Sequence, residues 1–199
     1  MTDADMECRR HRFDALFREH VAGVASYCRW RSGSSSDEQD AVGEVFLIAW
    51  RRLDEVPKGD EARPWLYATA RRVTANQARS NARRTRLRER LRAHPTAAAD
   101  EDDPLVGRVR EALATLGTRD REVLLLTEWE GLTAPEIAVV VGRPAVAVRS
   151  RLHRARKRFR AAFESQVPAG DSDAMSRLAA RPPMATAPAR STTFPSQGA

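Results

Sequence analysis

Residues 133–159, TAPEIAVVVGRPAVAVRSRLHRARKRF, decide the fold of the C-terminal part of the chain. Thr133 and Glu136 have the spacing of a capping box, which starts a helix. The apolar residues that follow predict a short helix ending at Gly142, because glycine readily adopts a positive φ. A second helix is predicted from apolar positions at helical spacing: Val148, Leu152, Ala155 and Phe159. Two short helices joined by a glycine turn predict a helix-turn-helix.

The second of these helices is strongly basic. Residues 143–160 hold eight Lys and Arg and no Asp or Glu. Arg149, Ser150 and His153 face away from the apolar stripe, in the half of a recognition helix that reaches base edges in the major groove. Flanking cations neutralise phosphates. A solvated basic face is the alternative, but eight like charges repel one another without a polyanion. The predicted DNA contacts are Arg149, Ser150, His153, Arg151, Arg154, Arg156 and Lys157.

The composition of the chain agrees with a polyanionic partner. It has 199 residues, 34 Lys and Arg against 27 Asp and Glu, and a formal charge of +7. Such a balance favours nucleic acid or an anionic membrane surface. No run approaches the 18 apolar residues of a membrane span, and the acidic first seven residues do not resemble a secretory signal. Two cysteines, Cys8 and Cys28, suit a reducing cytoplasm, so we expect a cytoplasmic protein.

Apolar spacing predicts helices through most of the remaining chain. One starts near Phe13, a second follows a cap at Asp37, and a third runs from Pro64 to Arg92. We therefore predict an all-α chain of two small helical domains joined by a flexible linker, the second being the helix-turn-helix domain. The predicted parts are an N-terminal extension (1–12), a first domain (13–92), an acidic linker (93–104), a second domain (105–165) and a disordered tail (166–199).

A second basic block lies in the first domain. Residues 71–92 carry nine arginines and one acid, Glu89. Trp65 and Tyr67 precede them, and aromatic rings beside a basic groove suit single-stranded nucleic acid because unstacked bases stack on them. For Trp65 alone, a core position is the more common explanation. For the arginine run, nucleic acid is the better one.

The helix before this block has the opposite charge. Asp37, Glu38, Asp40 and Glu44 occur there with no base before Arg51. An acidic patch on a basic chain suggests a protein partner. Acids near a helix N-terminus also complement the macrodipole, so an ordinary helix start is the alternative.

Three stretches together resemble the bacterial extracytoplasmic-function sigma factors, the promoter-specificity subunits of RNA polymerase. These are residues 40–50 (DAVGEVFLIAW), residues 65–71 (WLYATAR) and residues 130–156, which include the helix-turn-helix. The likeness covers about residues 13–165. Gly43 departs from the pattern, since the family usually has Gln there, and a mid-helix glycine costs about 1 kcal/mol.

The resemblance implies a role for each part of the chain. The acidic helix would dock on the largest polymerase subunit through Asp40, Glu44, Phe46 and Trp50, with Phe46 and Trp50 partly in the core. The next helix would recognise and melt the −10 element through Trp65, Arg72, Asn76, Arg79 and Arg83. The helix-turn-helix would read the −35 element. The implied partners are core RNA polymerase, promoter DNA and, as in many family members, an anti-sigma factor.

Two other functions compete with this hypothesis. A stand-alone helix-turn-helix regulator, binding duplex DNA as a dimer, explains residues 105–165 but leaves the acidic helix and first arginine run unassigned. An enzyme acting on nucleic acid needs clustered carboxylates for a metal, and only the linker offers them. The sequence contains no P-loop, dinucleotide-binding turn or HExxH pattern. The spacing of Cys8, His11, His20 and Cys28 fits no zinc finger. We therefore expect that the protein is not an enzyme and that it binds no metal or cofactor.

Overall fold

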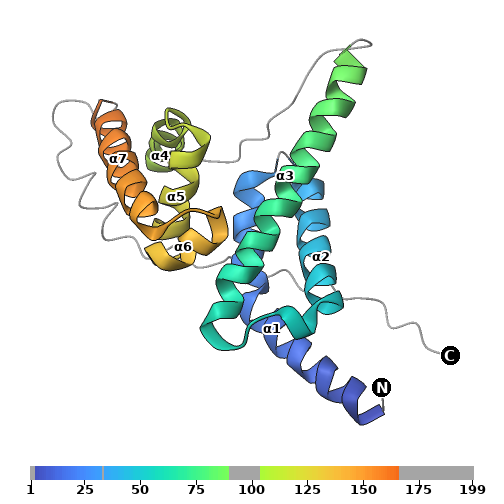
Figure 1. Ribbon diagram of the computed structural model, residues 1–199. Helices are drawn as coiled ribbons and strands as arrows, with labels where there is room; N and C mark the ends of the chain where they lie inside the picture. The colour runs from blue at the N-terminus through green and yellow to red at the C-terminus, as the bar shows by residue number, and fades with distance from the viewer. Residues whose placement is uncertain (1–2, 33, 90–103, 166–199) are drawn as a thin grey trace.

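The computed structural model describes residues 3–32, 34–89 and 104–165, with side chains described throughout except at 83–89 and 104. Most of these residues are helical and none lies in a strand, which confirms the predicted all-α class (Figure 1). The elements are α1 (Asp3–Arg31), α2 (Ser35–Arg51), the short 3-10 helices η1 (Leu53–Glu55) and η2 (Gly59–Glu61), α3 (Ala62–Glu89), α4 (Pro104–Ala114), α5 (Thr118–Glu128), α6 (Ala134–Val141) and α7 (Ala145–Glu164).

Helices α1, α2 and α3 form the N-terminal module, in which each helix packs against the other two (Figure 1). Their shared core consists of small and branched apolar side chains, including Val24, Val45, Ala49, Leu66 and Ala70. The buried positions of α2 and α3 recur every three or four residues, as the apolar spacing predicts. This core fixes which faces of α2 and α3 point outward.

Two helix starts differ from the predictions. The N-cap of α2 is Ser34 and not Asp37, because the Ser34 hydroxyl accepts the backbone N–H of Asp37 at 3.1 Å. Asp37 lies in the first turn, where its charge favours the helix dipole. The third helix begins at Ala62, two residues before Pro64, because η2 leads directly into it.

The predicted N-terminal extension is helical from Asp3 onward, as the first turns of α1. Arg9 donates to the Trp50 carbonyl at 2.7 Å and pairs with Asp54 at 2.9 Å. Arg12 donates to the Val56 carbonyl at 2.6 Å. These bonds tie the start of α1 to the end of α2 and the turn after it.

Helices α4 to α7 form the C-terminal module, and α6 and α7 are the predicted helix-turn-helix. Gly142 joins them with φ 65° and ψ 44°, the left-handed conformation expected of the glycine turn. Val148, Leu152 and Ala155 form the buried face of α7. The far end of α7 packs on α4, where Phe163 is completely buried.

The two modules, which were predicted as two small domains joined by a linker, share one hydrophobic core. Helix α6 packs along α3 (Figure 1). The buried cluster runs without interruption from Leu66 of α3 to Leu126, Leu132 and Ile137 of the C-terminal module. The predicted linker (93–104) and tail (166–199) lie outside the described residues, apart from Pro104, the first residue of α4.

Candidate nucleic-acid interface

The start of the helix-turn-helix is fixed by the predicted capping box. The Glu136 carboxylate accepts the backbone N–H of Thr133 at 2.7 Å and its hydroxyl at 2.6 Å. Burial raises the pKa of Glu136, but these bonds stabilise the charged form and the net pKa is lowered. At the other end of α6, the N–H of Arg143 donates to the Ala138 carbonyl at 3.1 Å. Local hydrogen bonds therefore fix both ends of α6.

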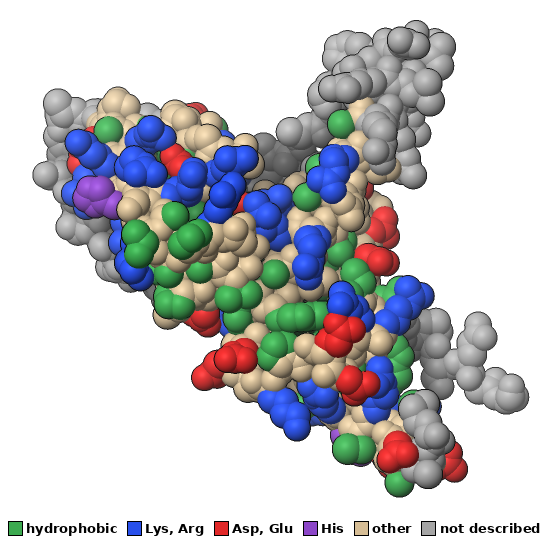
Figure 2. All heavy atoms as spheres, viewed as in Figure 1, with side chains coloured by type: hydrophobic (Ala, Val, Ile, Leu, Met, Phe, Trp, Pro, Cys, Tyr) green, Lys and Arg blue, Asp and Glu red, His purple; other side chains and the backbone are tan. Residues whose placement is uncertain are grey.

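The outward face of α7 carries polar and basic side chains with no protein partner. Arg149, Ser150, His153, Arg154 and Lys157 are all exposed. None of these side chains has a hydrogen-bond or ion-pair partner among the described residues. Figure 2 shows Lys and Arg side chains gathered over this module. The structure thus brings together five of the seven residues predicted to contact duplex DNA.

The remaining two predicted contacts lie on the flanks of α7 and bind carboxylates of α5. Arg151 pairs with Asp120 at 2.9 Å, and Arg156 pairs with Glu128 at 2.7 Å. Arg158 also pairs with Asp120, at 2.6 Å. These ion pairs hold α7 on α5. The charges along α7 alone do not predict these ion pairs, because the acidic partners belong to another helix.

The residues predicted for the −10 element share one face of α3. Arg72, Asn76 and Arg79 are exposed and lie at helical spacing. Arg72 donates to the Thr69 hydroxyl at 3.2 Å, and Arg79 donates to the Asn76 side-chain oxygen. Trp65 is half-buried and packs on the core. Arg83 lies in α3, but its side chain is outside the described residues.

The residues predicted for polymerase docking divide into two groups. Asp40 and Glu44 are exposed on one stripe of α2, without a side-chain partner in the described part of the chain. Phe46 is only 4% exposed and makes edge contacts with Phe13 and Phe17 at 6.4 and 4.7 Å between ring centroids. In this arrangement the ring lies in the core, as was expected in part, and its contact with a polymerase stays a prediction.

Trp50 and Leu47, near the end of α2, differ in their exposure to solvent. Trp50 is half-buried, with the Arg9 guanidinium 5.3 Å from its ring centroid. Leu47 is 40% exposed and follows Asp40 and Glu44 at helical spacing, so it continues the acidic stripe. Leu47 was not among the predicted docking residues, although its apolar side chain on a polar stripe can be recognised from the sequence. The stripe Asp40, Glu44 and Leu47 is called the α2 stripe below.

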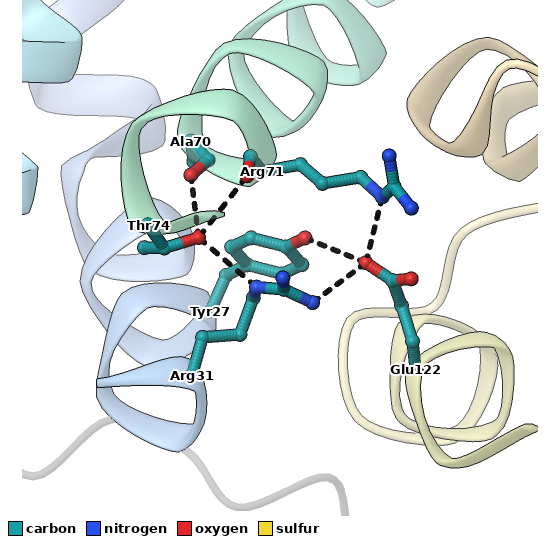
Figure 3. Close-up of polar contacts among 6 residues, drawn as sticks. All are labelled: Tyr27, Arg31, Ala70, Arg71, Thr74 and Glu122. Atoms are coloured by element: carbon teal, nitrogen blue, oxygen red, sulfur yellow. Dashed lines mark hydrogen bonds and ion pairs between the residues drawn. The ribbon is translucent and has the colours of Figure 1, made fainter. Parts of the chain in front are cut away.

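A buried carboxylate of the C-terminal module joins the two modules. Glu122 of α5 is 3% exposed, and its Oε1 accepts three hydrogen bonds from the N-terminal module (Figure 3). The donors are Tyr27 at 3.1 Å, Arg31 at 2.8 Å and Arg71 at 3.0 Å. Arg31 is itself positioned by its Nε, which donates to the Thr74 hydroxyl at 3.0 Å. Burial, reinforced by Glu122, raises the pKa of Tyr27 well above its usual value.

A second carboxylate of the C-terminal module also accepts hydrogen bonds from the N-terminal module. Glu130, after α5, accepts the Tyr67 hydroxyl at 2.6 Å and the Ser26 hydroxyl at 2.8 Å. Arg63 donates to the Glu130 backbone carbonyl. Neither carboxylate was among the residues predicted from the sequence. Glu122 carried a signal, since it adjoins an apolar run where an unpaired charge would be costly.

The described ranges contain no group of three or more His, Cys, Asp or Glu side chains suited to a metal ion. Cys28 is buried and Cys8 is exposed. Nor does any helix in these ranges have the length and apolar character needed to cross a bilayer.

Comparison with known proteins gives a consistent result for both modules. Residues 16–84 match the family model "Sigma-70 region 2", and residues 107–159 match "Sigma-70, region 4". RNA polymerase sigma factor NccH of Alcaligenes xylosoxydans xylosoxydans is 28% identical over 169 residues, covering 78% of this chain and 89% of that protein. ECF RNA polymerase sigma factor SigL of Mycobacterium tuberculosis is 29% identical over 153 residues, covering 73% and 85%.

A solved structure has the same fold. Sigma factor RpoE of Bartonella quintana, determined in complex with the anti-sigma factor NepR, superposes with a TM-score of 0.63. The two chains are 20% identical, and the match covers 78% of this chain and 98% of the other. With both sigma regions present in order, and curated relatives matched over most of their length, the chain belongs to the extracytoplasmic-function (ECF) sigma factors, a family of transcription initiation factors.

Proposed function

We propose that the chain binds core RNA polymerase through the α2 stripe and directs it to promoters whose −35 and −10 elements are recognised by α7 and α3. One observation carries the proposal. Three outward faces on different helices have distinct chemistry: a basic face on α7, a basic and amide face on α3, and an acidic and apolar stripe on α2. A stand-alone DNA-binding protein would not need the acidic and apolar stripe on α2.

The −35 element is assigned to the outward face of α7. Arg149 and His153 are exposed on the first half of the helix, which inserts into the major groove in helix-turn-helix proteins. Arg149 has both ends of its guanidinium available for a bidentate bond to guanine. Arg154 and Lys157 are placed to neutralise phosphates. Arg151 and Arg156 would have to share their guanidinium groups with Asp120 and Glu128.

The −10 element is assigned to the outward face of α3. Arg72, Asn76 and Arg79 combine cations for the backbone with an amide for a base edge, and half-buried Trp65 lies about two turns earlier on α3. Melting exposes unpaired bases, whose faces stack on aromatic rings. We propose residues 13–92 and 105–165 as the functional extents of the two domains.

The α2 stripe is assigned to polymerase docking. Its two carboxylates supply charge complementarity, and Leu47 supplies apolar area at its centre. Phe46 and Trp50 support the stripe from behind, since they hold α2 on α1. Sigma factor RpoE of Bartonella quintana was solved with an anti-sigma factor. We propose that an anti-sigma protein also competes for this chain.

The test is transcription in vitro with core polymerase, followed by mapping of transcript starts. Promoter-specific starts should appear only when the chain and the core enzyme are both present. Reversing the charge of the α2 stripe (Asp40→Lys with Glu44→Lys) should reduce co-purification with core polymerase at least tenfold. A matched double reversal at exposed acids elsewhere (Asp14→Lys with Glu164→Lys) should leave it unchanged.

Two results would contradict the proposal. Tight binding to a palindromic duplex without polymerase would favour a stand-alone regulator acting as a dimer. Equal co-purification of the wild type and the α2-stripe variant would remove the docking assignment.

A further inference from the structure

A cleft of about 510 Å³ lies between the two modules, and arginines line it from four different segments. Arg71 comes from α3, Arg119 from α5, Arg143 from the turn between α6 and α7, and Arg151 from α7. Its volume is in the range of small-molecule sites. The only acidic residue in its lining, within the described part of the chain, is Glu122.

The positive charge of this cleft is only partly balanced. Arg71 uses its Nε for Glu122, and its two terminal nitrogens point away from that bond (Figure 3). Arg151 uses one terminal nitrogen for Asp120. The side chains of Arg119 and Arg143 are exposed and have no hydrogen-bond or ion-pair partner among the described residues. Four guanidinium groups that line one cleft repel one another, and an anion bound between them would relieve this repulsion.

The ends of two helices add to this charge. Helices α5 and α7 begin after Gly117 and Pro144, and neither of these residues provides a side-chain cap. Residues of the first turn of each helix, Arg119 and Ala147, line the cleft. Uncapped N–H groups and the positive end of the helix dipole favour anions there.

Part of the cleft wall is apolar. Val123, Val141 and Val148 contribute to its lining. An inorganic ion gains nothing from contact with apolar side chains, whereas the sugar or base of a nucleotide can pack on them. The lining therefore suits a ligand that has a compact phosphate chain and an organic part.

We propose that this cleft binds a multivalent phosphate, of the kind carried by a nucleoside di- or polyphosphate, and that the bound phosphate holds the modules together. Arg71 belongs to the N-terminal module, and the other three arginines belong to the C-terminal module. A ligand that contacts both sides binds the docked arrangement better than a separated one. It shifts the equilibrium towards docking by that difference in affinity. The cleft shares Arg151 with the predicted −35 contacts, but none of the five side chains on the outward face of α7 lines it.

The first test is calorimetric titration of the full chain with pyrophosphate at 150 mM salt. We expect saturable binding with one site per chain. Replacing the two unpaired arginines (Arg119→Gln with Arg143→Gln) should weaken it at least tenfold. The matched control removes two exposed, unpaired arginines elsewhere (Arg10→Gln with Arg160→Gln) and should leave it unchanged. Absence of saturable binding, or equal weakening in the control, would overturn the proposal.

The second test examines the bridge between the modules. Cys8 is exposed and Cys28 is buried, so dyes can be attached at Cys8 and at a cysteine introduced by Ser165→Cys. In moderate urea, pyrophosphate should increase energy transfer between the dyes. Arg71→Gln should reduce this response several-fold, because the N-terminal module then loses its contact with the ligand. An unchanged response in Arg71→Gln would refute the bridge.

Phosphate could also come from a DNA backbone, and a third measurement separates the two sources. Binding of a short duplex should depend on Lys157 and not on the cleft. If Arg119→Gln with Arg143→Gln weakens duplex binding as much as pyrophosphate binding, the cleft serves DNA and the small-phosphate proposal is wrong.

Discussion

The Tyr67 hydroxyl donates a 2.6 Å hydrogen bond to Oε2 of Glu130, and both side chains are buried at the junction of the two modules. Burial and the neighbouring carboxylate raise the pKa of Tyr67, so the phenol stays protonated and remains a donor. Gly23 of α1 lies directly beside this bond. A Cβ atom at Gly23 would be 2.5 Å from the Tyr67 hydroxyl oxygen.

Gly23→Ala should therefore destabilise the protein. The added methyl group must displace the Tyr67 hydroxyl, because the ring is fixed in the core. We expect a loss of about 1–3 kcal/mol in the free energy of unfolding, from overpacking and a weakened buried hydrogen bond. Urea denaturation of the wild type and of Gly23→Ala measures this difference in the free energy of unfolding.

Gly43→Ala is the matched control for that prediction. A Cβ at Gly43 meets nothing within 4 Å, and the position is in the interior of α2. Alanine should stabilise the helix by about 0.5–1 kcal/mol. The two glycine substitutions are thus expected to have opposite signs. A Gly23→Ala protein as stable as the wild type would show that the junction is not closed in solution.

Glu122→Gln tests the other buried junction. The amide keeps the shape of the side chain but leaves Arg31 and Arg71 without their counter-charge. Breaking a buried ion pair in this way costs about 3–5 kcal/mol. We expect that loss in urea denaturation, together with an increased radius of gyration in small-angle scattering as the modules separate.

Glu111→Gln is the control for Glu122→Gln. Glu111 is exposed on α4 and its side chain has no partner within the described ranges. Its effect should stay within about 0.5 kcal/mol. If Glu122→Gln also stays within that limit, the carboxylate does not hold the modules together.

The helix-turn-helix was predictable because its determinants are local. The Thr133–Glu136 cap, the glycine turn and the apolar spacing of α7 all act within a few residues, and each is confirmed in the structure. The all-α class follows from the same periodicity. The assignment of Asp37 as a cap was wrong because Ser34, three residues earlier, accepts its N–H.

The junction between the modules was not predictable in the same way. Glu122 and Glu130 find their partners about 50 to 100 residues away in the sequence, and no local pattern identifies such pairs. The same reason explains why Arg151, Arg156 and Arg158 looked free along α7 but are paired with acids of α5. The packing of Phe46 on Phe13 and Phe17 is equally non-local, so the sequence indicates only that the ring lies partly in the core.

The two cysteines should differ strongly in reactivity. Burial, together with Glu38, raises the pKa of the Cys28 thiol to about 12, although Arg31 opposes the shift. At pH 8 a thiol reagent should modify Cys8 rapidly and Cys28 only after unfolding, because the thiolate is the reactive form. The raised pKa also predicts that stability falls as the pH rises above about 9, where the unfolded thiol ionises and the folded thiol does not.

Thiol counting with and without denaturant measures this difference. One fast-reacting group in the native protein and two in denaturant is the expected result. Cys28→Ala provides the control, since it should abolish only the slow group. Two fast groups in the native protein would contradict the burial of Cys28.

Arg149 and Lys157 separate base recognition from phosphate binding on the same exposed face of α7. Arg149→Ala should cost about 1–3 kcal/mol at one base pair of the −35 element and make the holoenzyme tolerant of substitutions there. Lys157→Ala should weaken binding to all promoters equally and reduce the slope of log K against log salt by about 1. Lys157 is a better phosphate probe than Arg158, because Arg158 already pairs with Asp120.

Binding of the holoenzyme to a set of single-base promoter variants at several salt concentrations measures both the base discrimination and the salt slope. If both variants lost discrimination at the same base pair, or both only reduced the salt slope, α7 would not lie in the groove with the first half of its outward face against the bases.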